Sequence, residues 1–430
     1  MKKICRKLKE ESLLSRVIQV DERPPLAQSI PLSLQHLFAM FGSTVLVPLL
    51  FHVNPATILL MNGIGTLIYL IICKGKVPAY LGSSFAFISP VFVVLSASGY
   101  NAALSGFIAV GVIFCIIALI IRYAGTGWIG VVFPSAAMGA IVAVIGLELV
   151  PTAADMAGIL PSEDFTPAKV FVSMATLFIT IIGSVAFRGF LKIIPILTGI
   201  VCGYVLAAII GMVDFSAVAE APWFAVPKFY TPEFNWAAIV VIAPAALVVM
   251  AEHMGHLIVT GNIVDKDLTR DPGLGRSMLG NGVSTILSGF LGSTPNTTYG
   301  ENIGVLAISK VYSTFVIGGA AVIAILLSFI GKLAALISSI PEPVMGGVSL
   351  LLFGVIAVSG IRMLVESKVD YSKPSNMMLT SVVLVIGISG AAFNIGSFTL
   401  TGMALATVIA ILLSLFFELL RILNLYSEDD

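Results

Sequence analysis

Residues 236–259 read WAAIVVIAPAALVVMAEHMGHLIV, an apolar stretch that contains one carboxylate and two imidazoles. About 20 mostly apolar residues are enough to cross a bilayer as a helix. An ionisable side chain at the bilayer centre costs roughly 2.5–3.5 kcal/mol, so such residues usually line a path for a substrate or a proton. Glu252, His253 and His256 are therefore the first candidates for a functional site inside a membrane.

The composition supports a membrane location. Hydrophobic residues make up 58% of the 430-residue chain and charged residues only 11%, with a mean hydropathy of +1.06. A soluble protein has about 25% charged residues. The formal net charge of zero argues against nucleic-acid binding. The four cysteines are dispersed, so neither a disulfide framework nor a thiolate metal site is expected.

Similar apolar stretches recur along the chain, and we expect about 14 membrane spans. The third and tenth are short and rich in Gly, Ser, Thr or Pro. The expected spans are residues 29–51, 55–73, 83–98, 102–121, 128–149, 169–187, 190–213, 236–259, 275–291, 297–309, 312–337, 343–364, 375–393 and 400–424.

The basic residues test this count, because cytoplasmic loops accumulate Lys and Arg. With the N-terminus inside, every Lys and Arg except Lys169, Lys228 and Lys332 falls on the cytoplasmic side. If one span in the middle were lost or added, the Lys and Arg residues would be spread over both sides of the membrane. The sequence therefore predicts an even number of crossings, with both termini in the cytoplasm.

Short strings recur in the same order in the two halves of the chain. Asn62–Ile68 returns as Asn281–Leu287, and Leu81–Ser84 returns as Leu291–Thr294. A repeat of half the chain divides the spans into seven and seven, and an odd number per half forces opposite orientations. The two interrupted spans then hold equivalent places. Such a pair indicates a binding site, because non-helical backbone at membrane depth must line a cavity or be buried in protein.

A second carboxylate lies in one of these interrupted spans. Glu301 belongs to the run Thr297–Gly304, which is rich in Gly and Thr. The half-helices that follow the two breaks would aim free N–H groups at a bound solute. Two acids and an imidazole in so apolar a chain predict a transporter that moves a polar solute together with protons.

Several motifs resemble the nucleobase–ascorbate transporter family, and more closely its branch of bacterial uracil:proton symporters. The resemblance covers nearly the whole chain from Glu22 onward, and Ser309 departs from the usual Thr while keeping a hydroxyl. The motifs are Glu22–Pro25, Gln35–His36, Pro78–Phe87, Ala251–His256 and Ser293–Asn302, with the family signature at Glu301–Gly304 and Ser309–Lys310.

The resemblance implies a division into domains. Residues 29–121 and 236–337 would form a core domain, and residues 128–213 and 343–424 a gate domain that the core moves against. Residues 1–28 would be a cytoplasmic N-terminal segment. The predicted fold is thus an all-α polytopic membrane protein with two inverted seven-span repeats.

The resemblance also implies local structure, partners and location. Short antiparallel strands around Ser83–Phe87 and Thr298–Glu301 would meet at the substrate. The protein would lie in the cytoplasmic (inner) membrane, contact lipid and commonly form a homodimer. Its partners would be uracil and protons, with no cofactor and no metal.

Uracil has two N–H donors and two carbonyl acceptors, and each unpaired polar group in a dry pocket costs roughly 1–3 kcal/mol. Glu252 and Glu301 are the expected acceptors for the ring N–H groups. Backbone N–H groups at Phe85 and Gly300 are the expected donors to the carbonyls. The Phe85 ring would stack on the base, and Gly300 would allow close approach of the backbone.

Glu252 and His256 are four residues apart, on one helix face, and are the candidates for proton coupling. The alternative is that this pair only joins two helices. Tyr299 is either a wall of the site or a hydrogen-bond donor. Ser84 either contacts the ligand or satisfies freed backbone groups.

Three other ionisable residues are expected to have other roles. His253 points elsewhere on its helix and is expected to pack. His36 is expected to brace the core, with substrate contact as the alternative. Glu148 lies at the outer end of its span and is expected to be a solvated end charge.

Three rival functions remain open. A purine such as xanthine is the first alternative substrate, although the acidic Glu301 favours a pyrimidine by resemblance. An ion channel is the second alternative, because channels also contain inverted repeats. A membrane enzyme is disfavoured, because no nucleophile–base group, metal set or phosphate loop accompanies the two acids.

Overall fold

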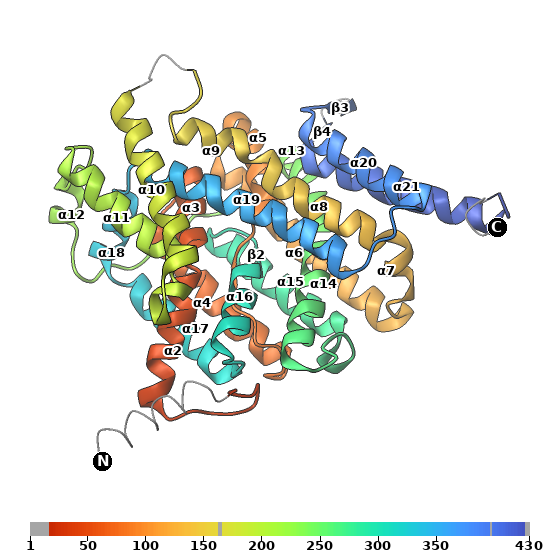
Figure 1. The fold of residues 1–430 in the computed structure, drawn as a ribbon, viewed down its shortest axis with the longest axis horizontal. Coiled ribbons are helices and arrows are strands. Elements are labelled where there is room, and N and C mark those ends of the chain that lie inside the picture. Colours follow the sequence, from red (N-terminus) through yellow and green to blue (C-terminus); the bar gives the residue numbers. More distant parts are fainter. Residues whose placement is uncertain (1–16, 162–165, 396–397, 426–430) are drawn as a thin grey trace.

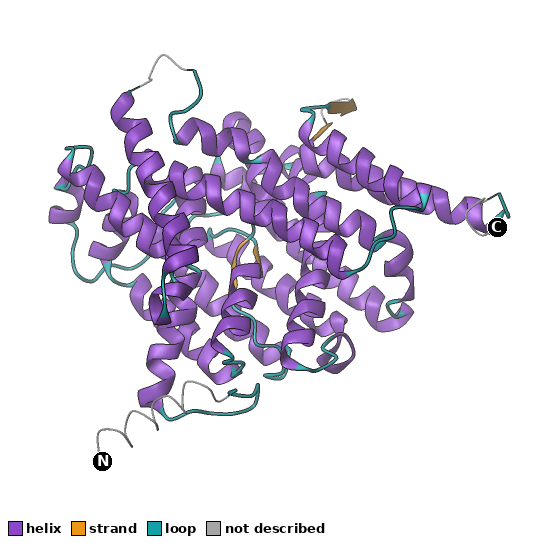
Figure 2. Ribbon diagram, viewed as in Figure 1, coloured by secondary structure: helices purple, strands orange, loops and turns teal. Residues whose placement is uncertain are grey.

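The computed structural model describes residues 17–161, 166–395 and 398–425. Figure 2 shows a molecule built almost wholly of helices, with one pair of short strands near its middle and another at its edge. Most of the expected N-terminal segment, residues 1–16, lies outside the described residues. Its remainder is anchored, because the Ile18 N–H donates to the Lys310 carbonyl at 3.0 Å and the Ile18 carbonyl accepts from Tyr312 at 2.8 Å.

The first half of the chain alternates long apolar helices with short breaks. Helix starts follow local chemistry: Asn54 caps α4 by accepting the Ala56 N–H, and Pro55 follows at the first helical position. The elements are α2 (Leu26–Ala39), α3 (Phe41–Phe51), α4 (Pro55–Ile72), β1 (Leu81–Ser83), η1 (Phe85–Phe87), α5 (Ile88–Ser98), α6 (Tyr100–Ala124), α7 (Gly127–Val132), α8 (Ser135–Glu148), α9 (Val150–Met156), α10 (Pro167–Ala186), η2 (Gly189–Ile193), α11 (Pro195–Ile209) and α12 (Ser216–Glu220).

The second half follows the same plan. Asn235 caps α13 and Ser313 caps α17, each accepting a backbone N–H of the first turn. The elements are α13 (Trp236–Ile242), α14 (Ala245–Val264), η3 (Thr269–Gly273), α15 (Leu274–Leu291), β2 (Asn296–Thr298), α16 (Gly300–Ser309), α17 (Thr314–Ser328), α18 (Gly331–Ser338), α19 (Glu342–Glu366), α20 (Pro374–Ile388), β3 (Ala392–Ile395), β4 (Phe398–Thr401) and α21 (Gly402–Ile422).

Each of the expected spans overlaps a helix or a pair of consecutive helices, although the third, the tenth and the last two also include parts of strands. Within the described residues, 8 helices are long and apolar enough to cross a membrane. Several further apolar helices are shorter, among them α11, α17 and α20. The protein is therefore a multi-pass, mostly helical membrane protein, whereas the number of crossings stays a prediction.

The strands in the two interrupted segments pair with each other. In antiparallel register, Leu81 lies opposite Thr298 and Ser83 opposite Asn296. The expected positions were a few residues too far along the chain, because one extended residue, Ser84 or Tyr299, follows each strand and a helical turn then begins. The meeting of the two strands was predicted and is confirmed.

A second strand pair was not expected. Strands β3 and β4 form an antiparallel ladder with Ala392 opposite Thr401, which occupies the predicted loop between the last two spans and overlaps the ends of both. The expected spans 375–393 and 400–424 therefore had wrong boundaries, since α20 already ends at Ile388. Alternation of aromatic, β-branched and polar residues in these segments suits a pleated strand better than a helix.

The longer helices pack in two groups. In one, α6 packs on α15, and α4 packs on both α15 and α17. In the other, α8 packs on α19, α20 and α21, and α10 packs on α11 and α19. Figure 1 shows α8, α19, α20 and α21 running together across the upper part of the view, with α4, α15, α16 and α17 below them.

Candidate functional site

Strands β1 and β2 lead directly into helical segments at the centre of the molecule. β1 is followed by η1 and α5, β2 is followed by α16, and α14 packs against η1, β2 and α16. The first N–H groups of a helix have no partner within that helix and carry the positive end of its dipole. Two helix starts therefore face the same region beside α14, which suits a solute with carbonyl oxygens.

Two threonines in corresponding positions hold the strands in place. The Thr66 hydroxyl on α4 accepts the N–H of Leu81, the first residue of β1, at 2.9 Å. The Thr285 hydroxyl on α15 accepts the N–H of Asn296, the first residue of β2, at 3.2 Å. Both threonines are fully buried and stand at the same place in the repeated string. The same local sequence thus fixes both breaks.

The two acids lie on neighbouring elements of this region. Glu252 is on α14, and Glu301 is in the first turn of α16. Helix α14, which carries Glu252, packs against α16, which carries Glu301, and the Oε2 atom of Glu252 is buried with no hydrogen-bond partner among the described residues. A buried carboxylate oxygen without a partner is costly. It requires a proton or an N–H donor from a bound solute.

Phe85 and Tyr299 form the aromatic side of the region. Their ring centroids are 6.1 Å apart, and the Tyr299 hydroxyl donates to the Ser83 carbonyl. Tyr299 therefore acts as a wall whose hydroxyl is engaged within the protein. Phe353 on α19 meets Phe85 edge to face with centroids 6.0 Å apart. No sequence signal distinguished Phe353 from the other phenylalanines, since its place depends on how the two helix groups pack.

Ser84 and Gly300 are placed differently from each other. The Ser84 N–H donates to the Pro295 carbonyl at 3.0 Å, and the Ser84 hydroxyl is buried with no partner among the described residues. Gly300 is exposed at the first position of α16. A Cβ added at Gly300 would lie 3.3 Å from Nε2 of His256. Gly300 and His256 are therefore neighbours across the site.

The histidines are more engaged than the sequence indicated. Nδ1 of His256 lies 3.2 Å from the Thr298 hydroxyl. His253 is fully buried, and both of its ring nitrogens have hydroxyl partners, which simple packing does not require. His36 is also buried, and its Nδ1 lies 3.0 Å from the Asn302 amide nitrogen. His36 thus braces α16 next to Glu301.

A cavity of about 280 Å³ lies between the two helix groups. Glu301 lines it together with Phe38 on α2, Ser184 on α10, Lys192 on η2 and Leu352 on α19. This volume is just below the range of small-molecule sites, about 300–1,000 Å³. Of the predicted site residues, Glu301 alone is among the described residues that line this cavity.

Glu148 is not the solvated end charge that its position suggested. It is half-buried at the end of α8, accepts the Ser89 hydroxyl at 2.7 Å and accepts the Met403 N–H at 3.0 Å. Gly402, with a φ of +52°, allows the chain to turn so close to this carboxylate that a Cβ there would clash with it. Glu148 thus connects α5 to the start of α21.

Comparison with known proteins places the chain in a family. Residues 27–396 match the family described as "Permease family". The chain belongs to this family. The permease is 68% identical over 418 residues to a "Uracil permease" of Paenibacillus larvae, covering 96% of this chain and 99% of that protein. It is 66% identical over 411 residues to a "Uracil permease" of Escherichia coli K12, covering 95% and 96%.

A solved structure shares the fold of the permease. The transmembrane domain of a cyanobacterial bicarbonate transporter, BicA, superposes with a TM-score of 0.65 at 12% identity, covering 93% of this chain and 100% of that domain. At this identity the likeness concerns the fold alone. The family match and the two permease relatives, with the apolar helices, show that the chain is a multi-pass transport protein and not an enzyme.

Proposed function

We propose that this permease is a uracil:proton symporter that imports uracil across the cytoplasmic membrane. The single observation that carries the proposal is the unpartnered oxygen of Glu252, held near Glu301 and beside two helix starts. The names of the two close relatives support uracil as the substrate. Proton coupling is supported by the resemblance and by the two acids.

The arrangement suits each polar group of uracil. Glu252 and Glu301 would accept the two ring N–H groups, while the N–H groups of Phe85 and Gly300 at the helix starts would donate to the carbonyls. The unpartnered Ser84 hydroxyl provides one more donor. The Phe85 ring would lie on the flat face of the base, with the ring of Tyr299 as a wall.

The proton would reach the carboxylates before uracil binds. Two carboxylates in one dry site repel each other, so a proton on Glu252 removes a charge that burial also disfavours. His256, on the same face of α14, would assist Glu252 in taking up the proton. Uracil would then bind to a site with one remaining negative charge. Uracil and the proton would both leave on the cytoplasmic side.

Movement of one helix group against the other would expose the site alternately to each side. We propose residues 29–121 and 236–337 as the core domain and residues 128–213 and 343–424 as the gate domain. The two packing groups fit this division, and Glu301 lines a cavity at their boundary.

An inverted repeat of seven plus seven spans, with cytoplasmic termini, is supported by the packing pattern. The contact of α6 with α15 has its counterpart in α17 with α4 when each span is exchanged for its equivalent. The contacts of α10 with α19 and of α20 with α8 are related in the same way. The role of residues 1–28 as a cytoplasmic segment rests on the placement of the basic residues, and the homodimer rests on the resemblance alone.

The test is uptake of labelled uracil into proteoliposomes with an imposed pH gradient. Wild type should accumulate uracil and lose accumulation when the gradient is collapsed, and Glu252→Gln and Glu301→Gln should each abolish it. Tyr80→Phe, which removes a buried hydroxyl without a partner among the described residues, is the matched control. Accumulation that survives loss of the gradient contradicts symport, and normal uptake by both acid variants contradicts the site.

The same assay separates the rival functions. Competition by unlabelled xanthine more strongly than by unlabelled uracil would assign the site to a purine. A flux that does not saturate with substrate and does not depend on the pH gradient would indicate a channel.

A further inference from the structure

Two histidines on α14 share one hydroxyl group. Nδ1 of His253 lies 3.1 Å from the Thr298 oxygen, and Nδ1 of His256 lies 3.2 Å from the same oxygen. Thr298 belongs to β2 and is 3% exposed, so the contact is shielded from water. The Thr298 hydroxyl thus links His256, which lies beside the proposed site, to His253, which does not reach the site.

The link continues away from the site. Nε2 of His253 lies 2.8 Å from the Ser277 hydroxyl on α15, and that oxygen lies 2.6 Å from the Tyr69 hydroxyl on α4. Tyr69, Ser277 and His253 are fully buried. The result is a row of five groups from four elements: Tyr69, Ser277, His253, Thr298 and His256.

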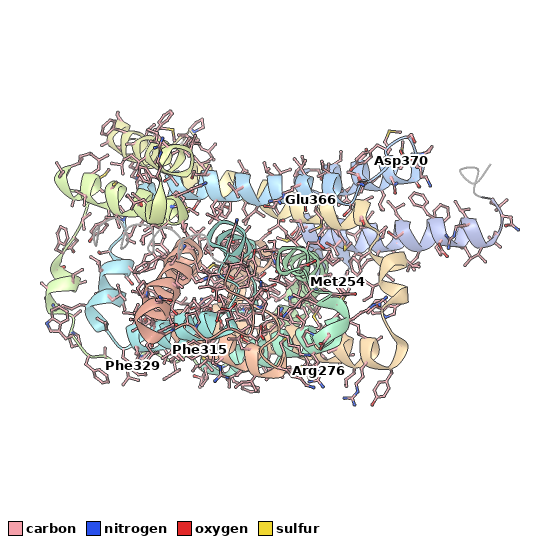
Figure 3. The ribbon with its side chains drawn as sticks, turned by 60° about the horizontal axis from the view of Figure 1, so that its bottom comes forward. Met254, Arg276, Phe315, Phe329, Glu366 and Asp370 are labelled. Atoms are coloured by element: carbon pink, nitrogen blue, oxygen red, sulfur yellow. The ribbon has the colours of Figure 1, made fainter. Side chains whose placement is uncertain are left out.

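Figure 3 labels Met254 and Arg276, the chain neighbours of His253 and Ser277. Met254, next to His253, lies among side chains packed between the helices, whereas Arg276, next to Ser277, reaches the lower edge of the view. The charged or titratable groups next to the row are Glu252 and Glu301 at its site end and Cys73 and Arg276 at its other end. No carboxylate is bonded to either histidine among the described residues, so hydroxyl partners decide the ring tautomers.

The positions of the hydrogens follow by counting. A neutral imidazole has one N–H and one bare nitrogen, and a hydroxyl has one hydrogen. The Thr298 hydroxyl has one hydrogen and two lone pairs, so it either donates to one Nδ1 and accepts from the other, which gives the two histidines opposite tautomers, or accepts from both. Hydroxyl donors approach to about 2.7–2.8 Å and N–H donors to about 2.9–3.0 Å. Ser277 has the Tyr69 hydroxyl as a donor at 2.6 Å, so it can give its own hydrogen to Nε2 of His253 at 2.8 Å, the shortest contact that either histidine makes among the described residues.

We propose that His253 is a positioning residue that fixes the tautomer of His256 through Thr298. His253 then carries its hydrogen on Nδ1 and donates to Thr298, and Thr298 donates to Nδ1 of His256. This leaves the hydrogen of His256 on Nε2, the atom that faces Gly300. His256 thereby presents an N–H donor to the site, which suits a carbonyl of the substrate.

The assignment of tautomers depends only on the hydrogen bonds. The effect of the His256 tautomer on uracil binding rests on the proposed function. With a bare Nε2 toward the site, His256 would meet a substrate carbonyl lone pair to lone pair. Loss of one neutral hydrogen bond would then raise the KM for uracil about two- to tenfold.

Nitrogen NMR of the full chain in lipid bilayers, with labelled histidine, tests the proposal. The chain has only 4 histidines, so each signal can be assigned by single substitution. At neutral pH, His253 is expected to carry its hydrogen on Nδ1 and His256 on Nε2. The same tautomer on both residues, or a hydrogen on Nδ1 of His256, overturns the proposal.

A distant substitution gives the second readout. Ser277→Ala removes the donor to Nε2 of His253 without touching His256, and it should change the tautomers of both histidines and raise the KM for uracil. Ser277→Thr keeps the hydroxyl and should restore both. Tyr80→Phe should leave the tautomers unchanged. A His256 signal that stays constant while His253 changes contradicts the link. Absence of uracil uptake in wild type with the expected tautomers rejects the proposed function instead.

Discussion

Replacing Thr66 or Thr285 by valine tests whether two matched hydroxyls hold the site strands in place. The substitution keeps the side-chain shape and removes the acceptor for one strand N–H, that of Leu81 or Asn296. Both strand residues are fully buried, so the orphaned N–H finds no water to replace its partner. Leaving a buried donor unsatisfied costs about 1–3 kcal/mol.

This cost becomes an effect on uracil binding because each strand leads into one of the two helix starts that we propose as donors to the substrate. If the strand relaxes to find another partner, the lost free energy appears in the Kd for uracil. A change of about 1.4 kcal/mol is tenfold in Kd, so about 1–3 kcal/mol corresponds to roughly 5- to 150-fold weaker binding. Equilibrium titration of the purified permease with uracil, together with its thermal unfolding midpoint, measures both consequences.

Matched variants separate the strand contact from general damage. Thr66→Ser and Thr285→Ser keep the hydroxyl and should bind uracil like wild type. Thr44→Val removes a buried hydroxyl that donates only to Met40, one turn earlier on the chain, and should have little effect. Normal uracil affinity in both strand variants, or a strong effect in only one of them, refutes the equivalence of the two breaks.

Two further substitutions test other contacts of the site. Gly82→Ala places a Cβ 1.9 Å from the ring of Tyr299, so this buried ring has to move. Uracil binding should be lost while the protein still reaches the membrane. Unchanged affinity for uracil contradicts the packing of Gly82 against Tyr299. Ser89→Ala removes the 2.7 Å bond to Glu148 and leaves the carboxylate with the Met403 N–H. This should loosen the contact of α5 with α21 and raise the labelling, from the outer side, of a cysteine placed at position 401 in the same pocket. Equal labelling of that cysteine with and without Ser89→Ala contradicts a linking role.

Much of the helical layout follows from local sequence. A stretch of some 20 apolar residues has to satisfy its backbone internally, and the helix is the simplest way to do so. The breaks were visible because Gly, Ser, Thr and Pro gather in Pro78–Ser84 and Ser293–Tyr299. The hairpin of β3 and β4 was missed because its apolar residues continue the hydropathy of the neighbouring helices.

The site was only partly accessible from sequence. Glu252 and Glu301 stand out because carboxylates are rare in apolar segments. The roles of His253 and Glu148 depend on hydroxyl and N–H groups from other elements, which no spacing within α14 or α8 reveals. The role of Phe353 also could not be predicted, since only the packing of α19 brings its ring to Phe85.

The central claim is that uracil binds where the two interrupted segments meet, between Glu252 and Glu301. Anomalous diffraction from crystals of the permease grown with 5-bromouracil tests it most directly, because the bromine marks the ring without ambiguity. We predict a single strong peak beside the Phe85 ring, within contact of α14 and the start of α16, that disappears when excess uracil is added. A peak elsewhere that uracil displaces, with none beside Phe85, contradicts the account.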